Sequence, residues 1–360
     1  MRGGSLIPVI GKGSIKMNTH RFSFVFSLFI VLAACSFQSC KKPGNAKSAF
    51  YYWKSSFSLD TKQTDLLKTA ANNTLYIRFF DVRWDNLRHE PFPDAVINFK
   101  QPVSNLHITP VIFMTNKSFE NISGNDVDSL AVHCNTLVNQ IAAKQNISYS
   151  QIQVDCDWTT TTRERYFDFL RSFRKLNRRH LEATVRLHQV KYKERTGVPP
   201  VDKGILMFYN MGRVSADPKQ PNSIYNEIDA EKYVAHVSRY PLPLDVALPL
   251  FSWSVHIREG KVIQLYGQLG KKQLDNKQNF EQDDSIYHAK KSFFLDGIYI
   301  KESDIFKLEQ MDEATVKKAA DQLSRYLPKQ QNRTIIYYEL GNLNLSEFKA
   351  ETLGKISADL

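Results

Sequence analysis

Strand-like and helix-like segments alternate along most of this chain, and the alternation limits its possible folds more than any other feature. The strand-like segments are short and rich in aromatic and β-branched residues, as in residues 75–82, 108–115 and 151–157. Helical apolar spacing lies between them, for instance over residues 128–144 and from about Thr162 onward. Such alternation indicates parallel strands joined by crossover helices.

The number of strands favours a closed sheet. Seven strands are clear, and we expect an eighth at residues 95–99. The other four clear strands lie at residues 181–190, 205–211, 246–255 and 334–340. Eight parallel strands over about 290 residues favour a (β/α)8 TIM-like barrel, which is an α/β fold, over an open doubly wound sheet. No glycine-rich phosphate loop follows the first strand, which further weakens the nucleotide-binding alternative.

One stretch, residues 256–311, breaks the alternation. It opens with a hairpin pattern that has Glu259 and Gly260 at the turn, and a polar run follows from Lys271 to Asp284. We expect a small insertion after the seventh strand, at the rim where the active sites of such barrels lie.

The N-terminus has the features of an export signal. An apolar run over residues 22–34 is preceded by His20 and Arg21, and it ends in small residues before a cysteine. At about 13 residues this run is too short to span a bilayer. Residues 1–34 are therefore predicted to be a signal peptide, with Met17 as a plausible true start.

The residues before Cys35 indicate how the exported chain is processed. Leu32-Ala33-Ala34-Cys35 resembles the bacterial lipobox, in which the cysteine thiol receives a diacylglyceryl group before cleavage. The resemblance implies a lipoprotein whose acyl chains, palmitate among them, anchor it in the cell envelope, and we expect the outer membrane. Cys40, preceded by Phe37-Gln38-Ser39, fits the pattern poorly. An ordinary secretory signal with an incidental cysteine is the alternative.

Composition divides the rest of the chain. Residues 35–48 are predicted to be the lipidated cysteine and a flexible tether, because the sequence KKPGNAKS lacks apolar residues that could anchor it. Residues 49–345 form the expected barrel, and residues 346–360 are left as a C-terminal tail.

The formal charge of +11 falls to +7 once residues 1–34 are removed. The basic residues are dispersed, and five of them lie on one predicted helix: Arg171, Arg174, Lys175, Arg178 and Arg179. They could attract anionic glycans or lipid headgroups, or form an ordinary solvated helix face. We expect no nucleic-acid partner.

Only Cys134 and Cys156 lie in the predicted globular body. Their spacing excludes a disulfide framework or a metal clip, and leaves two free thiols or a single bridge. The sequence also lacks H-E-x-x-H, a P-loop and G-x-S-x-G, so we expect no metal and no cofactor.

The strand at residues 151–157 has the clearest chemical character. Alternation directs Gln153, Asp155 and Asp157 into the barrel and the residues between them toward the helices. Two carboxylates two positions apart are separated by roughly 6.6 Å at Cα, so either one pKa rises or a cation lies between them. These groups are either a functional site or a structural ion-pair network.

Two motifs in this region resemble a known family. Asp155-x-Asp157-x-Thr159 is similar to the D-x-D-x-E signature of the family-eighteen chitinase-like glycosidases, and Met207-Phe208-Tyr209-Asn210 is similar to their M-x-Y-D signature. The resemblance implies a glycosidase-like barrel and a carbohydrate ligand. Thr159 replaces the general-acid glutamate, however, and a threonine cannot protonate a glycosidic oxygen near neutral pH. The hydrolytic mechanism therefore does not follow from the resemblance.

The chain also resembles uncharacterised glycosidase-like barrels of bacterial lipoproteins. These have a similar acidic strand followed by a helix of the type seen at residues 166–171. This second resemblance supports the fold more than the function.

Other strand ends offer partners for the acidic strand. Thr184, Arg186 and His188 are expected on one strand face, where Arg186 could neutralise an aspartate and His188 could act as a base or sugar ligand, or be structural. Glu339 ends the last strand. It could pair with Asp157 as acid and nucleophile if the carboxyl groups lie roughly 5–9 Å apart.

Aromatic residues near the predicted rim could stack on sugar rings or merely cap the core; they are Trp84, Trp158, Tyr209 and Trp253. Together with Arg186, His188 and Asn210 they form the expected ligand-binding set, while Asp155, Asp157 and Glu339 form the expected catalytic set. We therefore predict a membrane-anchored barrel that binds or processes an envelope or extracellular carbohydrate. The alternative is a catalytically inactive structural or protein-interaction lipoprotein.

Overall fold

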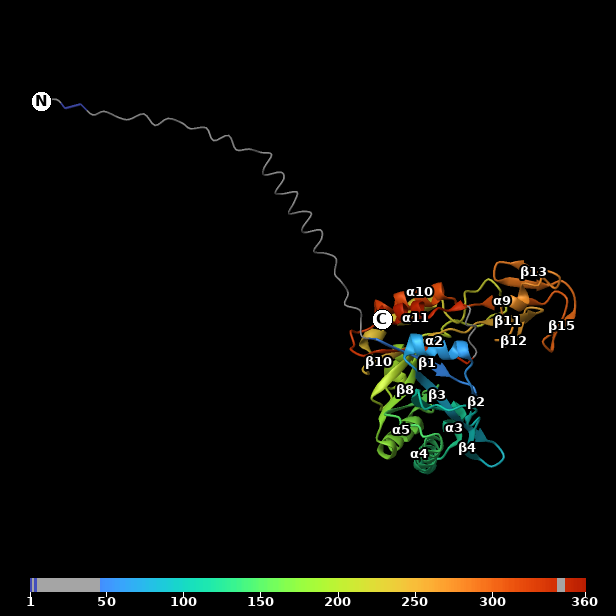
Figure 1. The fold of residues 1–360 in the computed structure, drawn as a ribbon, viewed down its shortest axis with the longest axis horizontal. Coiled ribbons are helices and arrows are strands. Elements are labelled where there is room, and N and C mark those ends of the chain that lie inside the picture. The colour runs from blue at the N-terminus through green and yellow to red at the C-terminus, as the bar shows by residue number, and fades with distance from the viewer. Residues whose placement is uncertain (2, 5–45, 342–346) are drawn as a thin grey trace. The chain divides into compact units, whose positions relative to one another are not determined.

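The computed structural model describes residues 1, 3–4, 46–341 and 347–360 (Figure 1). Eight parallel strands close into a barrel in the order β1-β18-β10-β9-β8-β7-β6-β3, and β1 pairs with β3 to complete the ring. The predicted (β/α)8 fold is confirmed. The barrel strands are β1 (Lys47–Tyr52), β3 (Thr74–Asp85), β6 (His107–Met114), β7 (Gln151–Cys156), β8 (His180–Arg186), β9 (Lys203–Met207), β10 (Leu244–Pro249) and β18 (Thr334–Tyr338).

The eighth strand is not where it was predicted. β1 fills the place between β18 and β3, and it begins inside the stretch predicted to be tether. Residues 95–99 instead contribute only β5 (Asn98–Phe99), which pairs with β2 (Ser56–Phe57) outside the barrel. The prediction was wrong because β1 has only four apolar residues, Ala49 to Tyr52, although all four are buried. Its polar start resembles a linker.

Two predicted strands end earlier than expected. β8 ends at Arg186 because the Gln189 side chain binds the backbone there. Its oxygen accepts a hydrogen bond from the Arg186 backbone N–H at 2.7 Å, and its amide donates to the Trp158 carbonyl at 2.9 Å. His188 therefore lies on the short helix α6 (Leu187–Lys191) and not on the strand. The predicted strand at 246–255 is likewise divided, since β10 ends at Pro249 and the following residues leave the barrel.

Helices cover the barrel because each has one apolar face. In α5 (Arg163–Asn177), Tyr166, Leu170 and Phe173 are buried against the sheet and the neighbouring α4. The remaining elements are β4 (Glu90–Asp94), α2 (Thr61–Ala71), α3 (Asn116–Asn121), α4 (Val127–Lys144), α7 (Lys193–Thr196), α8 (Glu227–Val234), α10 (Glu313–Ser324), α11 (Ala350–Ala358), and the 3-10 turns η1 (Gly124–Asp126) and η2 (Val237–Arg239).

The basic face of α5 is largely paired. Arg171 forms an ion pair with Asp168 at 2.6 Å, Arg174 pairs with Asp202, and Arg179 donates to the Tyr149 carbonyl at 3.0 Å. These contacts favour an ordinary solvated helix face over an anion-binding surface.

The insertion after β10, the seventh barrel strand, is a separate small sheet. Its five strands run in the order β12-β11-β17-β14-β13 and enclose a core of their own, which includes Phe280, Tyr287 and Phe306. The predicted hairpin turn at Glu259 and Gly260 joins β11 to β12, and both turn residues have positive φ. The insertion elements are β11 (Trp253–Arg258), β12 (Lys261–Tyr266), α9 (Lys271–Leu274), β13 (Phe280–Asp283), β14 (Ile286–Ala289), β15 (Phe293–Leu295), β16 (Ile298–Ile300) and β17 (Ile305–Glu309). Figure 1 shows them grouped together, away from α4 and α5.

The strand starts close the barrel with buried polar groups. Asp245 accepts hydrogen bonds from Lys203 Nζ and the Thr334 backbone N–H, both at 2.9 Å, and from Gln330 Nε2 at 3.3 Å. Glu182 is fully buried in the same region. This floor is opposite to the strand ends, so it lies outside the expected site.

Several predictions concern residues at the chain ends. The signal peptide, Cys35 and most of the tether lie outside the described residues and stay predictions. The predicted tail contains α11, whose Leu353 and Ile356 belong to the barrel core.

Cys134 and Cys156 are both buried free thiols. Among the described residues, no helix has the length and apolar character needed to cross a bilayer.

Candidate functional site

The acidic strand β7 directs its polar side chains into the barrel, as predicted. Gln153 reaches across the lumen, where its amide donates to the Tyr51 hydroxyl of β1 at 2.7 Å. Two residues further along the strand, Asp155 accepts a hydrogen bond from the Thr184 hydroxyl at 2.6 Å. Asp157 follows at the open mouth. Gln153 and Asp155 lie on one face of β7, and Asp157 directly follows the strand, so the three residues run from the middle of the lumen to its rim.

Arg186 neutralises the outermost aspartate. Its Nε and Nη2 atoms donate to the two Asp157 oxygens at 2.5 and 2.9 Å, which is the bidentate geometry that a guanidinium favours. Desolvation lowers the pKa of Arg186, but the hydrogen bond and charge of Asp157 outweigh it and raise the pKa overall. Asp157 is therefore committed to an ion pair and is poorly placed to act as a nucleophile.

Asp155 lies beneath this pair and is almost completely buried. Burial raises its pKa to about 6, and the opposing effects of Arg186 and the Thr184 hydrogen bond do not cancel the increase. A carboxyl group with this pKa can exchange a proton near neutral pH. Its direct partner is Thr184, and it does not line the cavity described below.

Aromatic rings fill the centre of the mouth around Tyr338. The Tyr209 ring stacks on it with centroids 5.6 Å apart, and Trp53, Tyr51 and Phe251 meet it edge-on at 5.6, 5.7 and 5.8 Å. Trp53, Phe251 and Tyr338 are only half-buried. They expose ring surface of the kind that packs against the apolar faces of sugars.

A cavity of about 580 Å³ opens beside this cluster, at the ends of β7, β8 and β9. Its lining residues are Asp157, Trp158, Thr159, Thr160, Arg186, Leu187, His188, Thr196, Tyr209, Asn210, Met211 and Tyr233. Among these lining residues Asp157 is the only one with a carboxyl group. Thr159, at the position of the family's acid, uses its hydroxyl within the loop, 2.8 Å from the Thr161 hydroxyl.

Asn210 and His188 complete the polar wall of the cavity. Asn210 is exposed and has a φ of 53°, a conformation that asparagine tolerates better than most residues. His188 lies at the start of α6 with much of its surface accessible. Partial desolvation of its ring outweighs the nearby Asp157 charge and lowers the pKa of His188. Both side chains can donate or accept hydrogen bonds to a neutral ligand at pH 7.

The other predicted residues lie elsewhere or are engaged. Trp158 is buried, stacks on Tyr166 and donates to the Thr196 carbonyl, so it caps the core. Trp84 pairs with the outer strand β4, and Trp253 donates to Glu309 at 2.8 Å; neither is among the residues that line the cavity. Glu339 accepts the Trp53 backbone N–H at 2.9 Å and is also absent from the lining. The structure therefore does not bring Asp157 and Glu339 together in this cavity.

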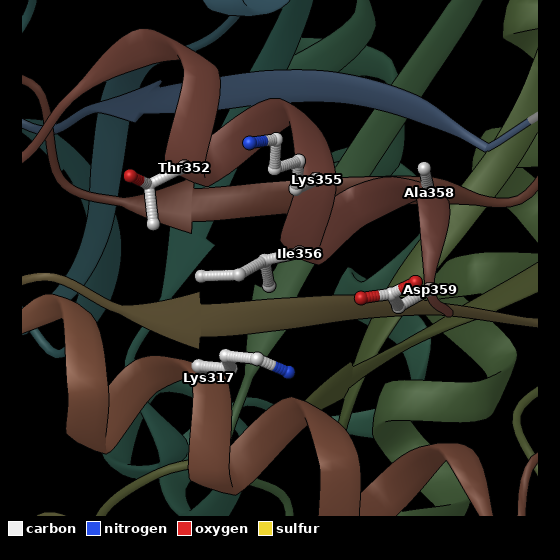
Figure 2. A pocket seen from close by; sticks show the side chains of 6 residues that line it. All are labelled: Lys317, Thr352, Lys355, Ile356, Ala358 and Asp359. Atoms are coloured by element: carbon white, nitrogen blue, oxygen red, sulfur yellow. The ribbon is translucent and has the colours of Figure 1, made fainter.

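A second hollow, of about 310 Å³, lies between α10 and α11 (Figure 2). Its lining includes Lys317 of α10 and Lys355 and Ile356 of α11. No strand end contributes a side chain to its lining. It is therefore a groove between packed helices, and the cavity at the barrel mouth is the candidate site.

Sequence reasoning missed part of the aromatic cluster. Trp53 was not identified because it follows β1, whose first two residues were assigned to the tether and whose remainder was not recognised as a strand. Phe251 was not identified because it was placed inside a continuous strand. The alternation of Tyr337 and Tyr338 at the end of the last strand was a usable signal, because one of two adjacent strand residues must face the lumen. Among the described residues no group of three histidine, cysteine, aspartate or glutamate side chains is placed to hold a metal.

Comparison with solved structures agrees with this architecture. The spore cortex-lytic enzyme SleL of Bacillus megaterium QM B1551 superposes with a TM-score of 0.54 at 11% identity, covering 89% of this chain and 75% of that one. SleL of Bacillus cereus gives 0.51 at 15% identity, with coverage of 86% and 73%. The chain shares the barrel fold of these two structures.

A further likeness is to the chitinase-like agglutinin of Robinia pseudoacacia, with a TM-score of 0.50, 12% identity and coverage of 86% of this chain and 98% of that one. These likenesses confirm the predicted distant similarity to chitinase-like barrels as one of fold. No protein-family profile and no curated protein sequence matches the chain.

Proposed function

We propose that this protein is a lipid-anchored envelope protein whose barrel binds a neutral carbohydrate without cleaving it. The observation that carries the proposal is the state of the acidic strand. Asp157 accepts hydrogen bonds from Nε and Nη2 of Arg186, and a threonine, Thr159, stands where the family has its general acid. Cleavage of a glycosidic bond requires a proton donor at the leaving oxygen, and the lining of the cavity offers no uncommitted carboxyl group.

Three further features support carbohydrate binding. The cavity has room for one or two sugar rings, its wall carries hydroxyl, amide and imidazole groups, and half-buried aromatic rings lie next to it. The charges of Asp157 and Arg186 cancel, which favours a neutral ligand over an anionic one. The neighbours in fold are by name a cortex-lytic enzyme and a chitinase-like agglutinin, so polymeric glycans are the first ligands to test.

The binding prediction concerns Asn210. We expect the lipidated protein in detergent to bind fragments of chitin, which are neutral, and Asn210→Gly to weaken that binding by about 2- to 10-fold through loss of one hydrogen-bonding group. Glycine keeps the positive φ, so the backbone is preserved. Asn146→Gly is the matched control, because Asn146 has the same φ of 53° at the C-terminal end of α4. Isothermal titration calorimetry measures both variants.

The same samples test for cleavage. After long incubation we expect the bound oligosaccharide to be recovered intact by mass spectrometry. Shortened products that disappear in Asp155→Asn or Asp157→Asn would identify the protein as a hydrolase instead. Absence of binding to every glycan tested would reject the carbohydrate proposal.

The anchoring prediction concerns Cys35. We expect Cys35→Ser to prevent acylation, so that a labelled fatty acid supplied to the cells is no longer incorporated into the protein. Cys40→Ser is the control and should leave the incorporation unchanged. Mass spectrometry of the N-terminal peptide identifies the acylated residue directly, and an unmodified Cys35 would contradict the proposal.

A further inference from the structure

A short hairpin of the insertion exposes two aromatic rings side by side. In β15 and β16, alternation turns Phe293, Leu295 and Ile298 toward the second core and leaves Phe294 and Tyr299 on the outer face. These two residues are direct cross-strand partners with ring centroids 5.3 Å apart. Phe294 is 73% exposed and Tyr299 49% exposed.

The base of this hairpin is firmly attached to the rest of the insertion. Buried Asp304, which follows β16, accepts two hydrogen bonds from Arg258 at 2.7 Å, one from the Lys301 backbone N–H at 2.8 Å, and one from His256 at 2.9 Å. Arg258 also donates to the Tyr299 carbonyl at 3.3 Å. The exposed rings are therefore presented by a fixed element.

Solvent exposure of the two aromatic rings on this face of the hairpin is unfavourable. The outer positions of a two-stranded ribbon are normally polar, and burial of a phenylalanine ring gains about 1.5–3 kcal/mol. Phe294 obtains only part of this gain from Tyr299. An exposed aromatic pair on a fixed hairpin indicates a contact surface.

Lysines lie at the base of the hairpin. Residues 258–261 and 290–304, which the Arg258 contact brings together, contain five basic and four acidic residues. Two of the basic residues are paired, Arg258 with Asp304 and Lys301 with Glu259. Lys290, Lys291 and Lys301 are exposed at the base of the hairpin. Exposed aromatic rings flanked by lysines match the interface of a bilayer with anionic headgroups, where aromatic rings sit at headgroup level.

The proposed anchor would keep the whole domain, and with it the hairpin, within reach of a membrane. The ten residues between Cys35 and Ala46 extend at most about 36 Å, so the domain cannot diffuse away from the bilayer. Tethering raises the effective concentration of the second contact to about the millimolar range, so even a weak contact is populated.

We propose that the β15–β16 hairpin is a second membrane contact, with Phe294 and Tyr299 inserted among anionic phospholipid headgroups. The inference rests on the proposed lipid anchor. A glycan platform is less suited to this surface, because the two rings are inclined by 51° and do not form one flat face.

The test uses the full lipidated chain in vesicles of phosphatidylethanolamine and phosphatidylglycerol. In Phe294→Trp, we expect the added tryptophan emission to shift to shorter wavelength and to fall about twofold when brominated phospholipids replace the ordinary ones. Leu87→Trp is the control, because Leu87 is 93% exposed on the loop between β3 and β4. Its added emission should respond to neither lipid. Wild-type emission is subtracted from both.

The charges and the ring pair are tested in the same background. Tyr299→Ser, or Lys290→Gln with Lys291→Gln, should reduce the quenching of the tryptophan at position 294, as should vesicles of phosphatidylcholine alone. Equal quenching at positions 294 and 87 would overturn the proposal. So would an emission change at position 294 that appears with glycan fragments and not with lipid.

Failure of the anchor is distinguishable from failure of the hairpin. An anchor that does not form leaves the whole protein out of the vesicles in a flotation assay. A hairpin that does not bind leaves the protein in the vesicles with the tryptophan at position 294 still in water.

Discussion

Replacing Lys307 by methionine is expected to destabilise the protein by about 3 kcal/mol, because the substitution strands a buried charge. Lys307 Nζ lies 2.7 Å from Glu309 Oε1, and both side chains are almost fully buried. The same ammonium group donates to the carbonyl oxygens of Gln220 and Pro221 at 2.6 and 3.1 Å. Methionine retains the apolar stem but satisfies none of these acceptors.

The control is an ion pair of similar geometry at the surface. Lys317 and Asp321 are 2.9 Å apart on α10, with both side chains about half exposed. We expect Lys317→Met to change the free energy of unfolding by less than about 0.5 kcal/mol. Urea denaturation followed by tryptophan fluorescence measures both variants, and equal losses would contradict the buried-pair interpretation.

A double variant separates charge from packing. In Lys307→Met with Glu309→Gln, the buried charge is removed. The glutamine oxygen can still accept from Trp253, which donates to Glu309 Oε2 at 2.8 Å, and from Ser223. We expect this variant to recover more than half of the stability lost in Lys307→Met. No recovery would indicate that the lysine acts through its contacts with the loop.

The position of this pair explains why the insertion matters to the site. The loop that follows β9 begins with Tyr209 and Asn210 at the cavity and returns to β17 through Ser223 and the carbonyls bound by Lys307. Gly212 N–H also donates to the Ser223 carbonyl at 3.0 Å, which closes the loop on itself. The insertion therefore holds the loop that supplies one wall of the cavity.

Most of the fold follows from local sequence patterns, and the exceptions have identifiable causes. Alternating strands and helices predicted the closed parallel barrel, because crossover connections leave few other arrangements for so many strands. β1 was missed since a strand that is short and starts with polar residues has no local signal of its own. What establishes it is pairing with β18 and β3, from residues far away in the chain.

The candidate site was predictable where a strand pattern directs side chains to one face. Asp155 and Asp157 were placed in the lumen by alternation, and Arg186 was proposed as their neutralising partner. Whether Arg186 pairs with Asp157 or with Asp155 depends on how far β7 and β8 extend, and the local sequence does not determine this. The aromatic cluster around Tyr338 combines four segments distant in the chain, so it emerges only in three dimensions.

The second large effect is expected at the barrel floor. The stability of Glu182→Gln relative to the wild-type protein should increase as the pH rises. Glu182 is fully buried, and among the described residues neither of its carboxyl oxygens has a partner at hydrogen-bond geometry. The nearby Tyr76 hydroxyl lowers the pKa of Glu182, but other effects are larger. Burial, followed by the charge of Asp245, raises the pKa of Glu182 to about 8, against an opposing effect of Lys203.

The sign follows from proton linkage. The unfolded chain loses the Glu182 proton near pH 4.5, while the folded protein keeps it until about pH 8. Between these values folding must take up a proton, so the wild-type protein loses stability as pH rises, by about 3–5 kcal/mol in total. Glutamine does not titrate. The stability of Glu182→Gln relative to wild type should therefore be similar to its low-pH value near pH 4.5 and should increase up to about pH 8.

Measuring the difference at several pH values removes effects that do not depend on protonation, such as the packing of the new amide in the floor. Urea unfolding of both proteins from pH 5 to pH 8.5 provides this difference directly. Glu281→Gln, at an exposed position on β13, is the control and should show no such trend. A constant difference between wild type and Glu182→Gln across this range would mean that Glu182 is already ionised in the folded barrel. Its charge would then have to be compensated by Lys203, which Asp245 now engages at 2.9 Å.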